Sequence, residues 1–137
     1  MSREAFPGGL QRLIDANLNR LGEGIRVIED INRYIHNDAL LTPRLKQLRH
    51  QLQKAYDPTR ITHRDIENDI QKESISSELE RTTLDDLVIA NFSRAEESAR
   101  VLEESFKLLD TQLSELFKNL RYELYALEKI YFQAEAT

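Results

Sequence analysis

Residues 16–30 are ANLNRLGEGIRVIED and residues 90–104 are ANFSRAEESARVLEE, so the chain contains one pattern twice. The shared positions are Ala-Asn-x-x-Arg-x-x-Glu-x-x-Arg-Val-x-Glu, 74 residues apart, and most of them are polar or charged. Two helices with merely similar cores would share their apolar spacing alone. A repeat of polar residues in one register predicts two copies of the same polar arrangement.

Apolar residues recur at helical spacing around both copies, which predicts helices over about 10–36 and 83–109. A further helix follows each of them, and LRHxL at 48–52 matches LRYxL at 120–124. We interpret Thr42 before Pro43 as one N-cap and Thr83 as another. The sequence predicts an all-α fold in which two helical hairpins, related by a pseudo-twofold axis, form a four-helix bundle.

The length fits a single domain over 1–137, with half-repeats at about 10–56 and 83–132. Residues 57–82 between them are polar and have no sustained apolar stripe, which predicts a long connecting loop. We expect this loop to be mobile without ligand and to become ordered over a cleft when ligand binds.

The 137 residues carry a formal net charge of −5, with 31% charged residues and no cysteine. A negative chain lacks the basic field of a nucleic-acid binder, and the absence of cysteine excludes disulfides and thiolate metal sites. No apolar run approaches the roughly 18 residues of a membrane span, and the start lacks a signal peptide's apolar stretch. We therefore expect a cytoplasmic protein that binds neither nucleic acid nor membrane.

A helical wheel places Asn17 in the middle of the apolar face of its helix, and Asn91 in the same place in the second copy. A buried amide needs a hydrogen-bond partner, so both should be bonded. We expect the two long helices to meet through these asparagines beside a polar-lined cleft. The charged residues at the margin of this face, at i,i+3 spacing, are Arg20 with Glu23 and Arg94 with Glu97.

A structural role is the alternative to a ligand site. A single core asparagine commonly sets helix register, and Arg–Glu pairs commonly decorate a solvated helix face. Four other charged residues of the repeat are placed nearer the outer face by the wheel and are expected to be solvated: Arg26, Glu29, Arg100 and Glu103.

No glycine-rich phosphate loop is present, so a nucleotide would have to be held by arginine, asparagine and metal. Arg64, Asp65 and Asp69 lie close together in the connecting loop. Such carboxylates could ligate Mg²⁺ while the arginine holds a phosphate, and they could equally serve only to solubilise the loop.

At these residues the sequence resembles a known family. It is similar to the small helical domain found in front of thiamine phosphate synthase in some bacteria, which also occurs alone and is regarded as an alternative hydroxymethylpyrimidine phosphate kinase. The chain departs from that family at Gly22, where an arginine is typical, and around Asp69, where a glycine is usual. The segments that carry the resemblance are 14–30, 45–52, 63–69 and 89–104.

The resemblance implies transfer of the γ-phosphate of ATP to hydroxymethylpyrimidine monophosphate, with Mg²⁺ as cofactor. Asn17 and Asn91 would bind the edge of the aminopyrimidine. The arginines that would neutralise phosphates are Arg20, Arg49, Arg64, Arg94 and Arg121. The carboxylates that would bind Mg²⁺ or accept the hydroxyl proton are Glu23, Glu97, Asp65 and Asp69, with Asp65 and Asp69 as the metal ligands.

The second hypothesis is a non-catalytic helical module that binds a pyrimidine phosphate or docks on thiamine phosphate synthase. An all-α fold does not select between this module and an enzyme. The resemblance favours the enzyme. The sequence leaves the oligomeric state open, a homodimer included.

Overall fold

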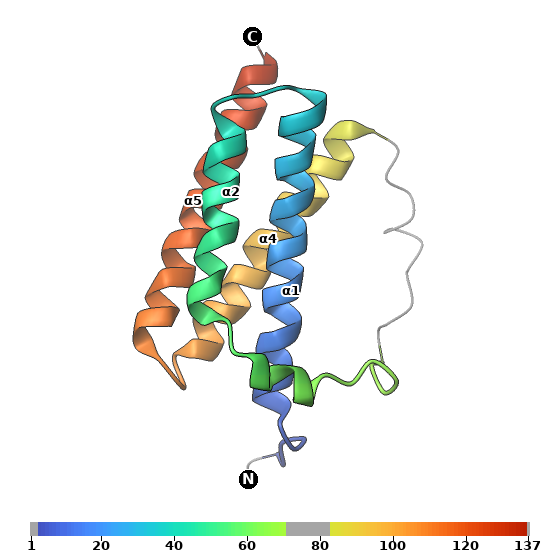
Figure 1. The fold of residues 1–137 in the computed structure, drawn as a ribbon, viewed down its shortest axis with the longest axis vertical. Helices are drawn as coiled ribbons and strands as arrows, with labels where there is room; N and C mark the ends of the chain where they lie inside the picture. Colours follow the sequence, from blue (N-terminus) through green and yellow to red (C-terminus); the bar gives the residue numbers. More distant parts are fainter. Residues whose placement is uncertain (1–2, 71–82, 137) are drawn as a thin grey trace.

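The structure is a computed structural model that describes residues 3–70 and 83–136, and within these ranges it contains helices and no strand (Figure 1). The long helices are α1 (Gly9–Asp30), α2 (Leu41–Gln51), α4 (Leu84–Phe106) and α5 (Thr111–Ala136). Three short helical segments follow α1 and α2: the π-helix η1 (Ile31–Ile35) and the 3-10 helices η2 (Leu52–Ala55) and η3 (Pro58–His63). Helices α1 and α2 run antiparallel, as do α4 and α5 (Figure 1). The predicted all-α helical bundle is confirmed.

Side-chain caps explain where two of these helices begin. Thr83 Oγ1 accepts a hydrogen bond from the backbone N–H of Asp86 at 3.0 Å, as predicted for the start of α4. The predicted cap at Thr42 is wrong, because α2 already begins at Leu41. The carboxylate of Asp38 accepts a hydrogen bond from the backbone N–H of Leu41 at 2.8 Å, and so satisfies a free amide one turn earlier than expected.

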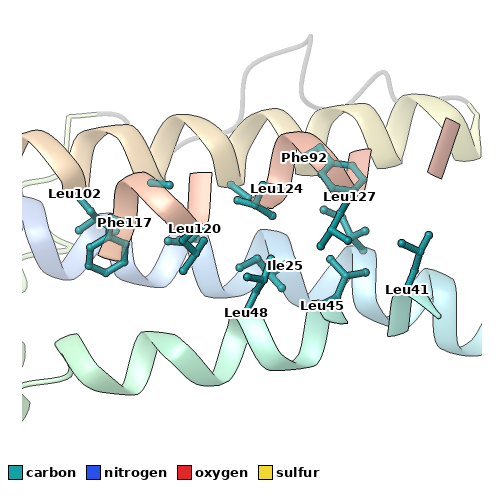
Figure 2. Close-up of a cluster of buried hydrophobic side chains, with 14 of the residues drawn as sticks. Ile25, Leu41, Leu45, Leu48, Phe92, Leu102, Phe117, Leu120, Leu124 and Leu127 are labelled. Carbon is teal, nitrogen blue, oxygen red and sulfur yellow. The ribbon is translucent and has the colours of Figure 1, made fainter. Parts of the chain in front are cut away.

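The hydrophobic core lies between the four long helices, and each of them contributes fully buried side chains (Figure 2). Figure 2 shows Ile25 of α1, Leu45 of α2, Phe92 of α4 and Leu124 of α5 pointing into this core. Each side chain of this kind stabilises the fold by about 1.5–3 kcal/mol on burial. In the described ranges no helix combines the length and the apolarity that a bilayer crossing requires.

The described part of the connection after α2 is more ordered than the sequence predicts. Pro58–His63 forms the short helix η3, which packs on the beginning of α1. Arg60 is buried there, donates to the Gln11 side chain at 2.9 Å and lies 5.5 Å from the centre of the Phe106 ring. The rest of the expected loop, 71–82, lies outside the described residues, so the expected closure over a cleft stays a prediction.

Helices α1 and α4 make the most extensive helix–helix contact of the described fold, and they are tightly packed at Gly24. A Cβ atom at Gly24 would lie 3.1 Å from the backbone oxygen of Asn91 and 3.4 Å from the Cβ of Ala95. The backbone oxygen cannot move aside as a flexible side chain would. Small residues are therefore required where α1 and α4 cross.

A carboxyl group is buried on the α4 side of the second hairpin. Glu96 is 9% exposed, and its Oε2 atom has no hydrogen-bond partner among the described residues. Burial, a hydrogen bond with Glu128 and the negative charges of Glu128 and Glu97 raise the pKa of Glu96 to about 8. At neutral pH the folded protein therefore keeps a proton on this carboxyl group.

Two glycines of α1 provide a matched test of the α1–α4 contact. We expect Gly24→Ala to lower the free energy of unfolding by about 1–2 kcal/mol, because the new methyl group meets a backbone atom. Gly22→Ala should raise the free energy of unfolding by about 0.5–1 kcal/mol, because alanine is more stable than glycine within a helix. The new Cβ atom would lie an ordinary 3.5 Å from Leu52. Urea unfolding of both variants checks the pair. If both variants changed the free energy of unfolding in the same direction, the close approach of α1 and α4 at Gly24 would be contradicted.

The raised pKa of Glu96 predicts how stability depends on pH. The unfolded chain releases this proton near the ordinary glutamate pKa of 4.5 and the folded protein near a pKa of 8, so stability falls as pH rises between these values. In Glu96→Gln the loss of unfolding free energy between pH 5 and pH 8 should be smaller than in wild type, by on the order of 2 kcal/mol. Urea unfolding at pH 5 and pH 8 measures it, with the exposed Glu115→Gln as control. A wild-type slope in Glu96→Gln would contradict the prediction.

Candidate functional site

Asn17 and Asn91 are both buried, at 6% and 2% exposure. Each side-chain amide donates to the backbone carbonyl one turn earlier, Asn17 to Leu13 at 2.9 Å and Asn91 to Leu87 at 2.8 Å. The expectation that both amides are buried and hydrogen-bonded is confirmed. This placement within the packed helices supports a structural role in both copies of the repeat.

Two buried ion pairs join the helices of the two hairpins. Glu29 is 3% exposed and accepts hydrogen bonds from Arg49 at 2.8 and 3.2 Å, between α1 and α2. Glu103 is 5% exposed and accepts from Arg121 at 3.1 and 2.9 Å, between α4 and α5. The expectation that both glutamates face solvent is wrong. Their burial is possible because each carboxylate has a guanidinium partner on the second helix of its hairpin.

The pairs raise the pKa of both arginines. A hydrogen bond and the charge of Glu29 raise the pKa of Arg49, and hydrogen bonds with Tyr125 and Glu103 raise that of Arg121. Both guanidinium groups are therefore permanently charged. The contacts are equivalent in the two halves of the chain, while the superposition of the halves by a pseudo-twofold axis stays a prediction.

The predicted i,i+3 pairs of the repeat do not form. Within the described residues, neither Arg20 with Glu23 nor Arg94 with Glu97 makes an ion pair. Arg94 is half-buried and the other three side chains are exposed. The charged residues of the repeat therefore form two sets. Glu29 and Glu103 make ion pairs between helices inside the protein. The second set makes no ion pair within the described residues: Arg20, Glu23, Arg94 and Glu97.

The segment after η3 is held to the start of α1 by ion pairing. Arg64 donates to both carboxylate oxygens of Asp15, at 2.8 and 2.9 Å, and the pKa of Arg64 is raised by this contact. The Asp65 carboxylate accepts two hydrogen bonds from Asn68, which lower its pKa. Arg64 would have to leave Asp15 before it could hold a phosphate.

The predicted metal ligands do not form a protein metal site in the described ranges. Asp69 is half-buried at the end of the described segment, and no three histidine, aspartate or glutamate side chains there are placed to hold one metal ion. Mg²⁺ that arrives on a nucleotide needs only one or two carboxylates besides the phosphates. Asp65 and Asp69 fit that lesser requirement.

One groove of the described surface lies between α1 and the end of α2, and we call it the first groove. Its volume is about 590 Å³. Two guanidinium groups lie here, Arg26 and Arg49, together with the Glu23 carboxylate and the exposed ring of Tyr56. The full lining is Leu18, Asn19, Gly22, Glu23, Arg26, Val27, Arg49, Leu52, Gln53 and Tyr56.

The arrangement can bind a planar ring that carries an anionic group. A ring can lie on Tyr56, and guanidinium groups bind phosphate or carboxylate through paired N–H donors. Arg26 is available because its bond to Asp30 is long, at 3.5 Å, and exposed. Arg49 is available in part, because its side chain is 24% exposed beside the buried Glu29.

A smaller groove of about 320 Å³ lies between α4 and α5, and we call it the second groove. Its lining is Ser93, Glu96, Glu97, Arg100 and Tyr125. Counted by the offsets of the repeat, these residues stand where the first groove has Asn19, Gly22, Glu23, Arg26 and Gln53. The two grooves therefore occupy equivalent positions of the sequence repeat.

The structure thus brings together only some of the predicted site residues. Glu23 and Arg49 line the first groove, and Glu97 lines the second. The predicted residues outside both grooves are Asn17, Arg20, Arg64, Asp65, Asp69, Asn91, Arg94 and Arg121. Sequence reasoning missed Tyr56 and assigned Arg26 to a solvated face. The match between LRHxL at 48–52 and LRYxL at 120–124 was the sequence signal that α2 belongs beside the first copy of the repeat.

Comparison with known proteins shows the family to which the chain belongs. Residues 12–130 match the ThiD2 family. The chain is 42% identical over 121 residues to thiamine-phosphate synthase of Thermosynechococcus vestitus, which covers 88% of this chain and 34% of that protein. It is 39% identical over 127 residues to the thiamine-phosphate synthase of Synechocystis sp., covering 92% of this chain and 37% of that protein.

The match is confined to part of these proteins. The thiamine-phosphate synthase of Nostoc punctiforme is 40% identical over 118 residues, again with 34% of that protein covered. The chain therefore spans about a third of the length of the curated relatives it matches. No solved structure matches it. The family match covers the whole helical repeat, so the chain belongs to the ThiD2 family and is associated with thiamine biosynthesis.

Proposed function

We propose that the chain is a phosphotransferase that uses ATP to convert hydroxymethylpyrimidine monophosphate to the diphosphate. Membership of the ThiD2 family and the relatives named thiamine-phosphate synthase support the pathway. The observation that carries the proposal is the first groove, where Arg26 and Arg49 lie with the ring of Tyr56. This set suits a pyrimidine with a phosphate group.

The reaction joins two anionic molecules, so its main demands are positioning and charge neutralisation. In the proposal an oxygen of the monophosphate attacks the γ-phosphorus of ATP, the bond from that phosphorus to the β–γ bridging oxygen breaks, and ADP leaves. The attacking oxygen belongs to a phosphate that is largely ionised at pH 7. No carboxylate is then needed to accept a hydroxyl proton, which corrects that expected role of Glu23, Glu97 and Asp65.

Arg26 and Arg49 are assigned to the monophosphate, and Tyr56 to the pyrimidine ring. Mg²⁺ bound with ATP would neutralise charge on the transferred phosphate group. Asp65 and Asp69 follow η3, and these two carboxylates are the proposed contacts of that ion, while Glu23 lines the first groove. Arg20 and Arg94 stay proposed nucleotide contacts, since the described fold does not pair their charges.

The repeat supplies a matched pair of variants for the test. Arg26→Gln removes a charge-assisted contact worth roughly 1.5–3 kcal/mol, so ADP formation should fall about tenfold or more. Arg100→Gln changes the equivalent residue of the second groove and should leave the rate within about threefold. The assay supplies ATP, Mg²⁺ and hydroxymethylpyrimidine monophosphate and measures ADP. Omitting the monophosphate should abolish ADP formation.

Two results would contradict the proposal. If wild-type protein forms no ADP above the control without monophosphate, the chain does not carry the activity. If Arg26→Gln and Arg100→Gln lose equal activity, the first groove is not the site.

One observation favours a second candidate, a non-catalytic module that works with thiamine phosphate synthase. The relatives that carry this name are about three times as long as the part that matches. Binding of the monophosphate without ADP formation would support this candidate. A complex with a separately expressed synthase, seen by analytical ultracentrifugation, would identify that enzyme as the partner, and the same experiment would reveal a homodimer.

A further inference from the structure

The two grooves occupy equivalent places but have become different. The position of Gly22 in the first groove is taken by Glu96 in the second, 74 residues later. The position of Tyr56 is taken by Glu128, 72 residues later. The volume falls from about 590 to about 320 Å³ between the two copies. Glu96 is buried in the space that the glycine leaves open.

The arginines of the buried ion pairs also differ in their access to a ligand. The Arg49 side chain is 24% exposed and lines the first groove. The Arg121 side chain is 11% exposed and does not line the second groove. Its guanidinium carbon lies 4.9 Å from the ring centre of Tyr122 and 5.8 Å from that of Tyr125. Two tyrosine rings therefore flank this cation.

Charge separates the grooves as well. Glu96 and Glu97 line the second groove, and Glu128 lies near enough to Glu96 to raise its pKa. The guanidinium of that groove, Arg100, is engaged with Glu103 at 3.3 Å and Glu104 at 3.2 Å. A phosphate there would meet the negative charges of Glu97 and Glu128, since Glu96 itself keeps its proton at neutral pH. The first groove is lined by two guanidinium groups, which are paired with Asp30 and Glu29, where the second groove has one.

We infer that the chain binds one phosphate-bearing pyrimidine, in the first groove, and that Gly22 determines this by keeping the groove open. The second hairpin is a scaffold whose copy of the groove is narrowed by Glu96. The inference rests on the proposed function for the identity of the ligand, but it concerns binding and does not require phosphate transfer.

Gly22 is suited to a direct test because its backbone tolerates a side chain. A Cβ atom there would lie 3.5 Å from Leu52 Cδ1, which is an ordinary contact. Gly22→Glu installs the residue of the second groove in the first. Its carboxylate would occupy the groove beside Arg26 and Arg49 and compete with phosphate for both.

The experiment is calorimetric titration of the full chain with hydroxymethylpyrimidine monophosphate, without ATP. Wild type should bind one equivalent. Gly22→Glu should weaken binding about tenfold or more, because a fixed anion replaces the phosphate at its guanidinium partners. The affinity of Gly22→Ala should lie between that of wild type and that of Gly22→Glu. Glu96→Gly should keep both the affinity and the single equivalent, because Arg121 stays packed against its tyrosine rings.

Thermal melting followed by circular dichroism establishes that each variant is folded. Two equivalents on wild type, wild-type affinity in Gly22→Glu, a second equivalent in Glu96→Gly, or no binding to wild type would each overturn the inference. Should binding follow the expected pattern while no ADP forms with ATP and Mg²⁺, the kinase proposal fails and the inference stands.

Discussion

The fold depends on the two buried Glu–Arg ion pairs that connect the helices of each hairpin. A carboxylate in an apolar interior is very costly unless a partner balances it, and removing one member of a buried pair costs about 3–5 kcal/mol. Glu29 therefore holds α2 in the register at which Arg49 reaches it, and Glu103 does the same for Arg121 on α5. The close approach of α1 and α4 at Gly24 then joins the two hairpins.

The same ion pairs have different consequences on the two sides of the molecule. In the first hairpin, Arg49 satisfies Glu29 and still presents part of its guanidinium to a groove that Gly22 leaves open. In the second hairpin, two tyrosine rings flank Arg121, and Glu96 fills the equivalent space. The two halves thus share these internal contacts, while the guanidinium of the ion pair is more accessible in the first half.

Much of the fold could be predicted from the sequence because helical periodicity and the repeat are local patterns. The four long helices and the buried amides of Asn17 and Asn91 follow from them. The site was harder, because a single helical wheel contains no information on the partner helix. It placed Glu29 outside, where α2 in fact covers it, and it could not reveal the groove that Tyr56 forms with α1.

An amide NMR titration of the chain with hydroxymethylpyrimidine monophosphate tests the central claim most directly, since each backbone N–H reports on its own surroundings. The account predicts shifts concentrated at Gly22, Arg26 and Tyr56, and unchanged amides around Ser93 and Arg100. Shifts centred on the second groove, or of equal size in both grooves, would contradict it.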